Sequence, residues 1–438
     1  MIDEVLARAR RVCQEAEVFS LTTEETPVSF ESNRLKLLQS RQSQGLALRL
    51  IVDGRLGFAA TTDLSAGSAQ ALVEAALEVA PFGAEARFSL PSPQSYADVA
   101  IYEPATAAVS VEAMVELGQQ LIDRVRAHTP ELLCDAGLGK SVINIRLANT
   151  NGADVAYRKT MFSIGLSGTL VRGTDMLFVG DGQSSCAPIT SVDAIVADTV
   201  RQLELARDVV PAPTGDVPVV FTSRGVAAAL LWPLLTALNG KSVLLGSSAL
   251  AGRLGERVFD ARLSIADDAT LALRPASRPC DDEAVPSRRL SLIENGIVAS
   301  FYYDLQTAAR AGAASTGSGH RSLASQPAPS TSSIVIAPGD APFDAMLADI
   351  ADGVVVERLM GAEQGNILSG DFSGNIVLGY RVERGRIVGR VKDAVVSGNV
   401  YRALADIAAI GSERRWVGGV YCPPLYCRGL SVAAKGSS

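Results

Sequence analysis

The sequence predicts an α+β fold in two domains, with an N-terminal α+β domain over residues 1–210 and a strand-rich C-terminal domain over residues 217–438. In the N-terminal part, apolar residues at helical spacing occur beside runs in which apolar and other residues alternate. The alternating runs meet at tight-turn sequences such as Asp53-Gly54, which is typical of antiparallel hairpins. Beyond residue 217, short β-like runs separated by Gly turns favour a strongly bent sheet or a partial barrel.

The elements of the N-terminal domain follow from these two periodicities. Leu46, Leu48 and Leu50 alternate with other residues before the Asp53-Gly54 turn, and the alternation resumes after it. This pattern predicts a hairpin over residues 45–60. The same reasoning predicts helices over 2–13, 66–80, 114–128 and 191–208, a Pro- and Ser-rich connector over 90–104, and a strand pair around Asn151-Gly152.

The linker and the C-terminal domain differ in character. Pro211, Pro213 and Gly215 disfavour regular structure and mark the boundary between the domains, as does the nearby Pro218. An apolar helical segment that leads into a Gly turn follows over residues 230–242. Beyond it we expect strands over 289–293, 297–303, 333–337, 376–381 and 386–392, helices over 343–350 and 401–410, and a long Ala/Ser-rich loop over 311–333.

Composition excludes several functional classes. The 438 residues carry a net charge of −7, so no overall basic field points to nucleic-acid binding. The N-terminus lacks the features of a signal peptide, and no apolar run approaches the roughly 18 residues of a membrane span. We therefore expect a soluble cytoplasmic protein without a membrane partner. The six dispersed cysteines are expected to be free thiols.

Common catalytic motifs are incomplete. The Gly-Lys-Ser strings at 139–141 and 240–242 lack the Gly that a phosphate loop needs five residues before its Gly-Lys pair. No Gly-x-Ser-x-Gly nucleophile elbow is present. The only histidines are His128, at a predicted helix end, and His320, in a Gly-rich loop, so a paired nucleophile and base would have to use one of these two.

Two acidic features remain as candidates. Asp281, Asp282 and Glu283 form a run that we interpret as a solvated turn, with a metal or acid/base pair as the alternative. Asp371 lies in the string Gly-Asp-Phe-Ser-Gly, where flanking glycines permit positive φ. Its carboxylate could tie the loop or contact a ligand amide.

Long strings across the chain resemble the TldD/PmbA family, which was labelled a modulator of DNA gyrase and is regarded as a peptidase system. The similar strings, in chain order, are AEVFSLTTEETPVSFESNRLKLLQSRQSQGLALRLIVDGRLGFA, DDEAVPSRRLSLIENGIVASFYYD, STGSGHRS, ERLMGAEQGNILSGDFSGNIVLGYRVERGRI and VSGNVYRALADIAAIG. Their order and spacing extend the resemblance over nearly the whole chain.

The resemblance distinguishes two kinds of subunit. The TldD kind has a zinc site built from a His-Glu-x-x-x-His helix and a distant Cys, in which the Glu can activate a bound water. The PmbA kind, also called TldE, lacks these ligands and pairs with the first. On the family pattern, Trp232 and Ala237 occupy the histidine positions and Pro233 the Glu position, while Cys422 falls near the Cys ligand. The resemblance therefore implies a PmbA-like chain with no catalytic residue and no metal site of its own.

The resemblance also implies a dimer, in which two similar subunits enclose an extended peptide. A TldD-like catalytic subunit would supply the zinc, and this chain would form a wall of the substrate chamber. Candidate peptide-binding residues are Thr316, Gly317, His320 and Asp371. A strand-rich domain can offer backbone donors and acceptors to an added peptide strand.

Two alternatives stay open. One is a self-sufficient hydrolase with a site built from Asp281, Asp282, Glu283 and His320. The other is a non-enzymatic, homodimeric peptide-binding module. The older gyrase label could imply direct DNA contact. An acidic chain without basic stripes gives no physical support for such contact. The sequence does not identify the substrate peptide.

Overall fold

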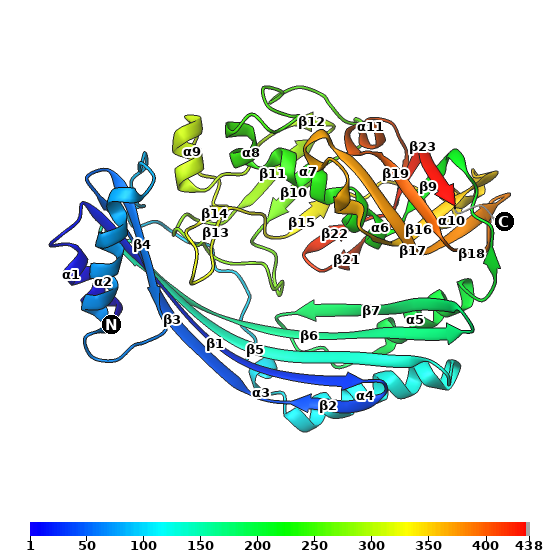
Figure 1. The fold of residues 1–438 in the computed structure, drawn as a ribbon, viewed down its shortest axis with the longest axis horizontal. Coiled ribbons are helices and arrows are strands. Elements are labelled where there is room, and N and C mark those ends of the chain that lie inside the picture. Colours follow the sequence, from blue (N-terminus) through cyan, green and yellow to red (C-terminus); the bar gives the residue numbers. More distant parts are fainter. Residues whose placement is uncertain (435–438) are drawn as a thin grey trace.

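A long, curved antiparallel sheet forms the N-terminal lobe of the molecule (Figure 1). The computed structural model describes residues 1–434, with all their side chains except that of Gln364. Strand order is β4-β3-β1-β5-β6-β7, with the short β2 also paired to β1. The strands are β1 (Glu15–Glu31), β2 (Arg34–Leu38), β3 (Arg41–Val52), β4 (Arg55–Thr61), β5 (Leu133–Asn149), β6 (Asp154–Arg172) and β7 (Asp175–Ser185).

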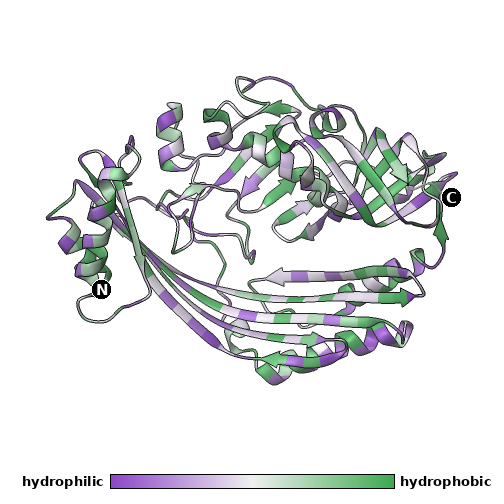
Figure 2. Cartoon of the chain, viewed as in Figure 1, coloured by the Kyte–Doolittle hydropathy of each residue, from purple (hydrophilic) through white to green (hydrophobic). Residues whose placement is uncertain are grey.

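Alternation along these strands gives the sheet two different faces, visible as banding in Figure 2. The predicted hairpin is confirmed as β3 and β4, with Asp53 and Gly54 at φ of 49° and 72° in the turn. The predicted pair around Asn151-Gly152 is confirmed as β5 and β6. The β3–β4 pairing, from Leu46 with Thr61 to Val52 with Arg55, matches the predicted range closely, whereas the β5–β6 pair is far longer than the sequence pattern indicates.

Helices cover the convex face of the sheet and one of its ends (Figure 1). Apolar side chains of α4 (Val111–His128) and α5 (Asp193–Leu205) share a core with Phe30, Phe162 and Ile164. At the far end α1 (Ile2–Ala9) and α2 (Ser68–Val79) pack on β3 through a separate core. The concave face is left facing the C-terminal lobe.

The C-terminal lobe contains a closed five-stranded barrel and a second sheet. Strands β16, β9, β23, β19 and β17 are neighbours in that order, and β17 pairs again with β16 to close the ring. These five strands are β9 (Gly215–Phe221), β16 (Asp352–Met360), β17 (Asp371–Glu383), β19 (Ala394–Asn399) and β23 (Leu425–Ala434). The remaining partners of this sheet are β8 (Val209–Val210), β18 (Arg386–Val391) and β20 (Ile407–Ile410). The predicted α+β class and bent C-terminal sheet are confirmed.

The second sheet has the order β12-β11-β10-β15-β22-β21, so β21 is one of its edges. Its strands are β10 (Ile265–Asp268), β11 (Arg289–Glu294), β12 (Ile297–Val298), β15 (Ile334–Ile336), β21 (Arg415–Val417) and β22 (Val420–Cys422). A two-stranded ribbon of β13 (Gly319–His320) and β14 (Ala328–Pro329) lies within the predicted long loop. In Figure 1 the β21–β22 hairpin lies above β7 and β6 of the long sheet.

Several sequence expectations were wrong in detail. Pro218 lies inside β9, so the linker is shorter than expected. Only residues 297–298 of the run 297–303 form a strand, since the chain then turns under α9 (Leu305–Ala311). The predicted helix 401–410 ends at Ala405, the last residue of α11 (Val400–Ala405), and continues as β20 because residues 407–410 pair with β23. These runs were ambiguous because short apolar segments fit helix and strand alike.

The apolar segment over 230–242 is an interrupted helix. It follows directly after α6 (Ser223–Ala229) and comprises α7 (Leu231–Leu238) and the start of α8 (Gly240–Leu244). Pro233 has no N–H to donate to the carbonyl of Ala229, which accounts for the break between α6 and α7. The predicted Gly turn is the start of α8, where the Asn239 side chain caps the Lys241 amide.

Candidate functional site

The floor of the candidate site is the concave face of the long sheet. Gly137 of β5 pairs with Gly165 of β6, and Gly139 pairs with Ser163. Residues of this parity face away from α4, whereas Leu138 and its even-numbered neighbours enter the core. A Cβ atom added at Gly137 would meet no atom within 4 Å. The floor is therefore built from small residues beneath open space.

The roof of the site is the β21–β22 hairpin. The rings of Trp416 and Tyr421 are stacked with centroids 4.8 Å apart. The guanidinium of Arg274 lies 4.2 Å over the Trp416 ring, and that of Arg414 lies 4.3 Å over Tyr421. We call these four residues the arginine–aromatic stack. Floor and roof enclose a cavity of about 750 Å³, the sheet–hairpin cavity.

One side of this cavity is the free edge of β7. The side-chain amide of Gln202 donates to the Gly180 carbonyl at 3.1 Å and accepts from its N–H at 3.0 Å, as a neighbouring strand would. The Cys186 N–H donates to the Leu273 carbonyl at 3.0 Å. By alternation, the backbone groups of Gly182 and Ser184 point the same way as those of Gly180 and Cys186. Among residues 1–434 no outward partner is found for these two, and both line the cavity.

A second cavity of about 460 Å³ lies on the same concave face, at the other end of the strands, and we call it the His320 cavity. Lys159 of β6 lines it and donates its Nζ to the Pro275 carbonyl at 2.7 Å. Burial lowers the pKa of Lys159 to about 8. Its other charged lining residues are Arg278, Asp282, His320 and Arg321.

The acidic run beside this cavity is buried, so its interpretation as a solvated turn was wrong. Asp281 and Glu283 are fully buried and Asp282 nearly so. Asp281 accepts backbone N–H groups from Glu283, Val285 and Gly319 at 2.8–3.0 Å, an arrangement that folds the loop around its carboxylate. The run therefore has a structural role, in which the Asp281 carboxylate holds the loop together through backbone hydrogen bonds.

Asp282 and Glu283 connect the loop to its surroundings. Although burial opposes ionisation, a hydrogen bond from His320 Nδ1 at 2.9 Å and the charge of Arg278 hold the pKa of Asp282 below its ordinary value. Glu283 accepts from Arg49 Nη1 of β3 at 2.7 Å and so joins the two lobes. Glu17 also contacts Arg49, at 3.1 Å.

The fully buried Glu283 should make stability depend on pH. Burial, reinforced by nearby carboxylates such as Asp281, raises the pKa of Glu283 to about 8 despite the charge of Arg49. An unfolded chain releases this proton near pH 4.3. Between about pH 5 and 8 the folded state then holds the extra proton, so stability should fall as pH rises through this interval. We expect Glu283→Gln to reduce this slope in urea unfolding measured at several pH values, and parallel curves for the two proteins would contradict the assignment.

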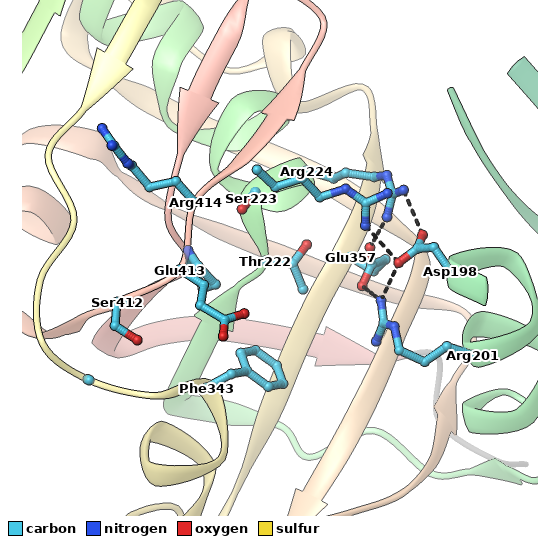
Figure 3. A pocket seen from close by; sticks show the side chains of 14 residues that line it. Asp198, Arg201, Thr222, Ser223, Arg224, Phe343, Glu357, Ser412, Glu413 and Arg414 are labelled. Atoms are coloured by element: carbon cyan, nitrogen blue, oxygen red, sulfur yellow. Dashed lines mark hydrogen bonds and ion pairs between the residues drawn. The ribbon is translucent and has the colours of Figure 1, made fainter. Parts of the chain in front are cut away.

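A network of ion pairs beside the β21–β22 hairpin connects the two lobes (Figure 3). Arg224 of α6 contacts Asp181 at 2.6 Å, Asp198 at 2.7 Å and Glu357 at 2.5 Å. Arg415 contacts both aspartates as well. Burial alone would raise the pKa of Asp198, yet the arginines hold it well below its ordinary value. This interlobe ion network lines an adjoining cavity of about 430 Å³.

Helix α7 carries no donor set for zinc. Trp232 is 60% exposed, while Pro233 and Ala237 are buried among apolar side chains. None of the three offers a lone pair suited to a metal. Cys422 is fully buried, its Sγ donates to the Ser223 carbonyl at 3.3 Å, and burial raises the pKa of its thiol to about 12. The residues at these positions therefore do not fit the zinc ion that the resemblance implies for the TldD kind of subunit.

No group of three or more His, Cys, Asp or Glu poised for a metal occurs among the described residues 1–434. All six cysteines are free thiols, as expected. His128 ends α4, its ring lies 3.3 Å from Glu204, and it lines a different cavity from His320. No helix in the described part of the chain is long and apolar enough to cross a membrane.

The four peptide-binding candidates do not converge on one site. Thr316 uses its hydroxyl to accept from the Tyr303 N–H at 2.7 Å, and Gly317 adopts a positive φ of 74° in the same turn. Asp371, at the start of β17, accepts from Asn399 at 2.8 Å and ties its loop. Only His320 lines one of the cavities on the concave face.

Sequence reasoning missed the arginine–aromatic stack and the small-residue floor. A signal for the former exists in the run Arg414, Arg415, Trp416 before a Gly-Gly turn. Nothing in the sequence pairs that run with Arg274 or with Gly137, because they are more than a hundred residues away along the chain.

A curved sheet roofed by a barrel lobe, with cavities on its concave face and an open strand edge, defines a class of two-lobed cavity proteins. Three family domains match the chain in order: PmbA/TldA metallopeptidase domain 1 over 16–80, the central domain over 104–207 and the C-terminal domain over 214–434. The chain belongs to the PmbA/TldD family. The first two of these domains contribute strands to one continuous sheet.

Two curated relatives match this chain over most of their own length. An uncharacterised protein of Methanocaldococcus jannaschii is 24% identical, with 90% of each chain covered. Metalloprotease PmbA of Escherichia coli O157:H7 is 24% identical over 96% of this chain and 92% of that protein. The crystal structure of TldE from Thermococcus kodakarensis superposes with a TM-score of 0.88 at 24% identity, covering 99% of both chains, and so has the same fold.

Proposed function

We propose that this chain is the PmbA/TldE-like subunit of a two-subunit metallopeptidase, which holds an extended peptide while a TldD-like partner supplies the zinc. The observation that carries the proposal is α7, where Trp232, Pro233 and Ala237 stand at the positions of a metal-binding helix. A single buried thiol at Cys422 cannot replace three missing ligands. The chain itself then has no cofactor and no catalytic residue.

Peptide binding is supported by the edge of β7. Two residues, Gly182 and Ser184, present backbone donors and acceptors toward the sheet–hairpin cavity. An extended peptide can add to such an edge as a further strand. On the cavity floor, Gly137 leaves open space that side chains of the added strand can enter. In this arrangement the chain forms one wall of the substrate chamber.

The proposal predicts that activity requires the partner. The purified chain should bind no stoichiometric zinc and cleave no peptide, whereas its complex with a relative carrying an intact His-Glu-x-x-x-His helix should do both. Elemental analysis and peptide cleavage with and without a chelator measure this. Tightly bound zinc in the isolated chain, with activity lost on chelation, would overturn the proposal.

A self-sufficient hydrolase remains a second candidate because Asp282 orients His320, as an acid orients a catalytic imidazole. Ser330 and Ser332 line the same cavity. Cleavage by the isolated chain that is abolished in His320→Ala would favour this candidate. Isolation from native cells as a homodimer without a TldD-like partner, and without activity, would favour a peptide-binding module. We also propose a cytoplasmic location, since free thiols persist in reducing compartments.

A further inference from the structure

The charged residues that line the two cavities on the concave face are mainly cations, although the chain as a whole carries a charge of −7. Each cavity has three cationic side chains against one carboxylate. They are Arg274, Arg414, Arg415 and Asp181 in the sheet–hairpin cavity, and Lys159, Arg278, Arg321 and Asp282 in the His320 cavity. A positive lining in an acidic protein favours an anionic occupant through charge complementarity.

The arginines of the arginine–aromatic stack have no counter-charge. Arg415 pairs with Asp181 and Asp198. In contrast, no carboxylate among residues 1–434 lies within ion-pair distance of Arg274 or Arg414. Burial lowers the pKa of Arg274, which is the expected effect when a guanidinium leaves water without an acidic partner.

Stacking fixes these two guanidinium groups without consuming their hydrogen-bond donors. Arg274 and Arg414 lie over the faces of Trp416 and Tyr421, so their attraction to the rings acts perpendicular to the guanidinium plane. The N–H groups lie in that plane and stay free for bidentate contact with a carboxylate. The stack therefore presents two preorganised carboxylate receptors.

The stack and the free edge of β7 border the same cavity. Alternate side chains of a strand added beside Gly182 and Ser184 would point to one face of the sheet, toward the hairpin. Resting on the proposed function, we infer that the peptide held here is acidic, with Asp or Glu side chains at alternate positions bound by Arg274 and Arg414. Neutral peptides would use the same strand edge without these contacts.

Calorimetry on the purified chain tests this inference, because the sheet–hairpin cavity is built from this chain alone. The probes are two blocked hexapeptides, acetylated and amidated, with either Glu or Gln at alternate positions between alanines. We expect the Glu peptide to bind at least about tenfold more tightly at low salt, as charge-assisted contacts to arginine allow. The preference should shrink as salt is added.

Variants assign the preference to the stack. Arg274→Gln with Arg414→Gln should abolish it, so that the variant binds the Glu and Gln peptides with similar affinity. Arg274→Lys with Arg414→Lys retains the charge and should retain part of the preference, which guards against simple misfolding. The control is Arg10→Gln with Arg11→Gln. These two arginines are exposed at the end of α1, so their replacement removes the same charge far from the cavity.

Equal affinity of the chain for both peptides, or a full preference in the Gln double variant, would overturn the inference of an acidic substrate. Either result would leave the proposed function standing if the complex with a TldD-like partner still cleaves peptides. Failure of both peptides to bind the chain, together with an inactive complex, would overturn the proposed function itself.

Discussion

Replacing Arg224 with Met should destabilise the folded protein by about 3 kcal/mol, because breaking a buried ion pair leaves uncompensated charge behind. Arg224 is nearly buried and contacts Asp181, Asp198 and Glu357, which come from both lobes. Met retains most of the apolar stem volume, so loss of packing contributes little. Arg415 and Arg201 still contact part of this acidic group and keep the expected loss near the lower end for buried pairs.

The shift of the urea midpoint, followed by circular dichroism at fixed pH, measures this effect. Arg253→Met is the matched control, since Arg253 forms an exposed pair with Glu256 at 2.9 Å and such pairs contribute about 0–1 kcal/mol. Equal shifts in the two variants would contradict the role given to the interlobe ion network. A separate early transition in Arg224→Met would show that the network holds the lobes together.

Replacing Gly137 with Leu should lower kcat/KM of the complex with a TldD-like partner by about a hundredfold, equal to about 2.7 kcal/mol. The Leu side chain would project from the floor into the sheet–hairpin cavity, where a Cβ atom meets nothing within 4 Å. It would take up cavity volume that side chains of a peptide bound at the β7 edge would otherwise enter. Folding should be unaffected or slightly improved, because Gly in a strand interior is unfavourable.

Gly137→Ala and Gly137→Val provide the matched series for this prediction. All three variants remove the same backbone freedom, so stability should change little among them, whereas cleavage should fall with side-chain size. Thermal unfolding and cleavage of one extended peptide are measured on each. Cleavage by Gly137→Leu at the unmodified rate would show that peptides do not lie over this part of the floor.

Local patterns were sufficient for the fold class and for most elements. Alternation ending at Asp53-Gly54 predicted the β3–β4 hairpin, and helical spacing predicted α4, since these signals come from neighbouring residues. Strand ends, the helix–strand change at residues 405–407 and the closure of the barrel depend on pairing with distant segments. The two-domain division and the peptide-binding roles of Thr316 and Gly317 stay predictions.

By itself the sequence determined the α+β class and the family, because both are properties of short strings and their order. Only the tertiary structure decided which residues share a cavity. Gly137, Gly182, Arg274 and Trp416 come from four distant segments, and they meet because β5 and β7 pair through β6 while the barrel lobe sets a hairpin above them. The burial of the acidic run 281–283 is likewise a tertiary outcome, since Arg49, which pairs with Glu283, lies in the other lobe.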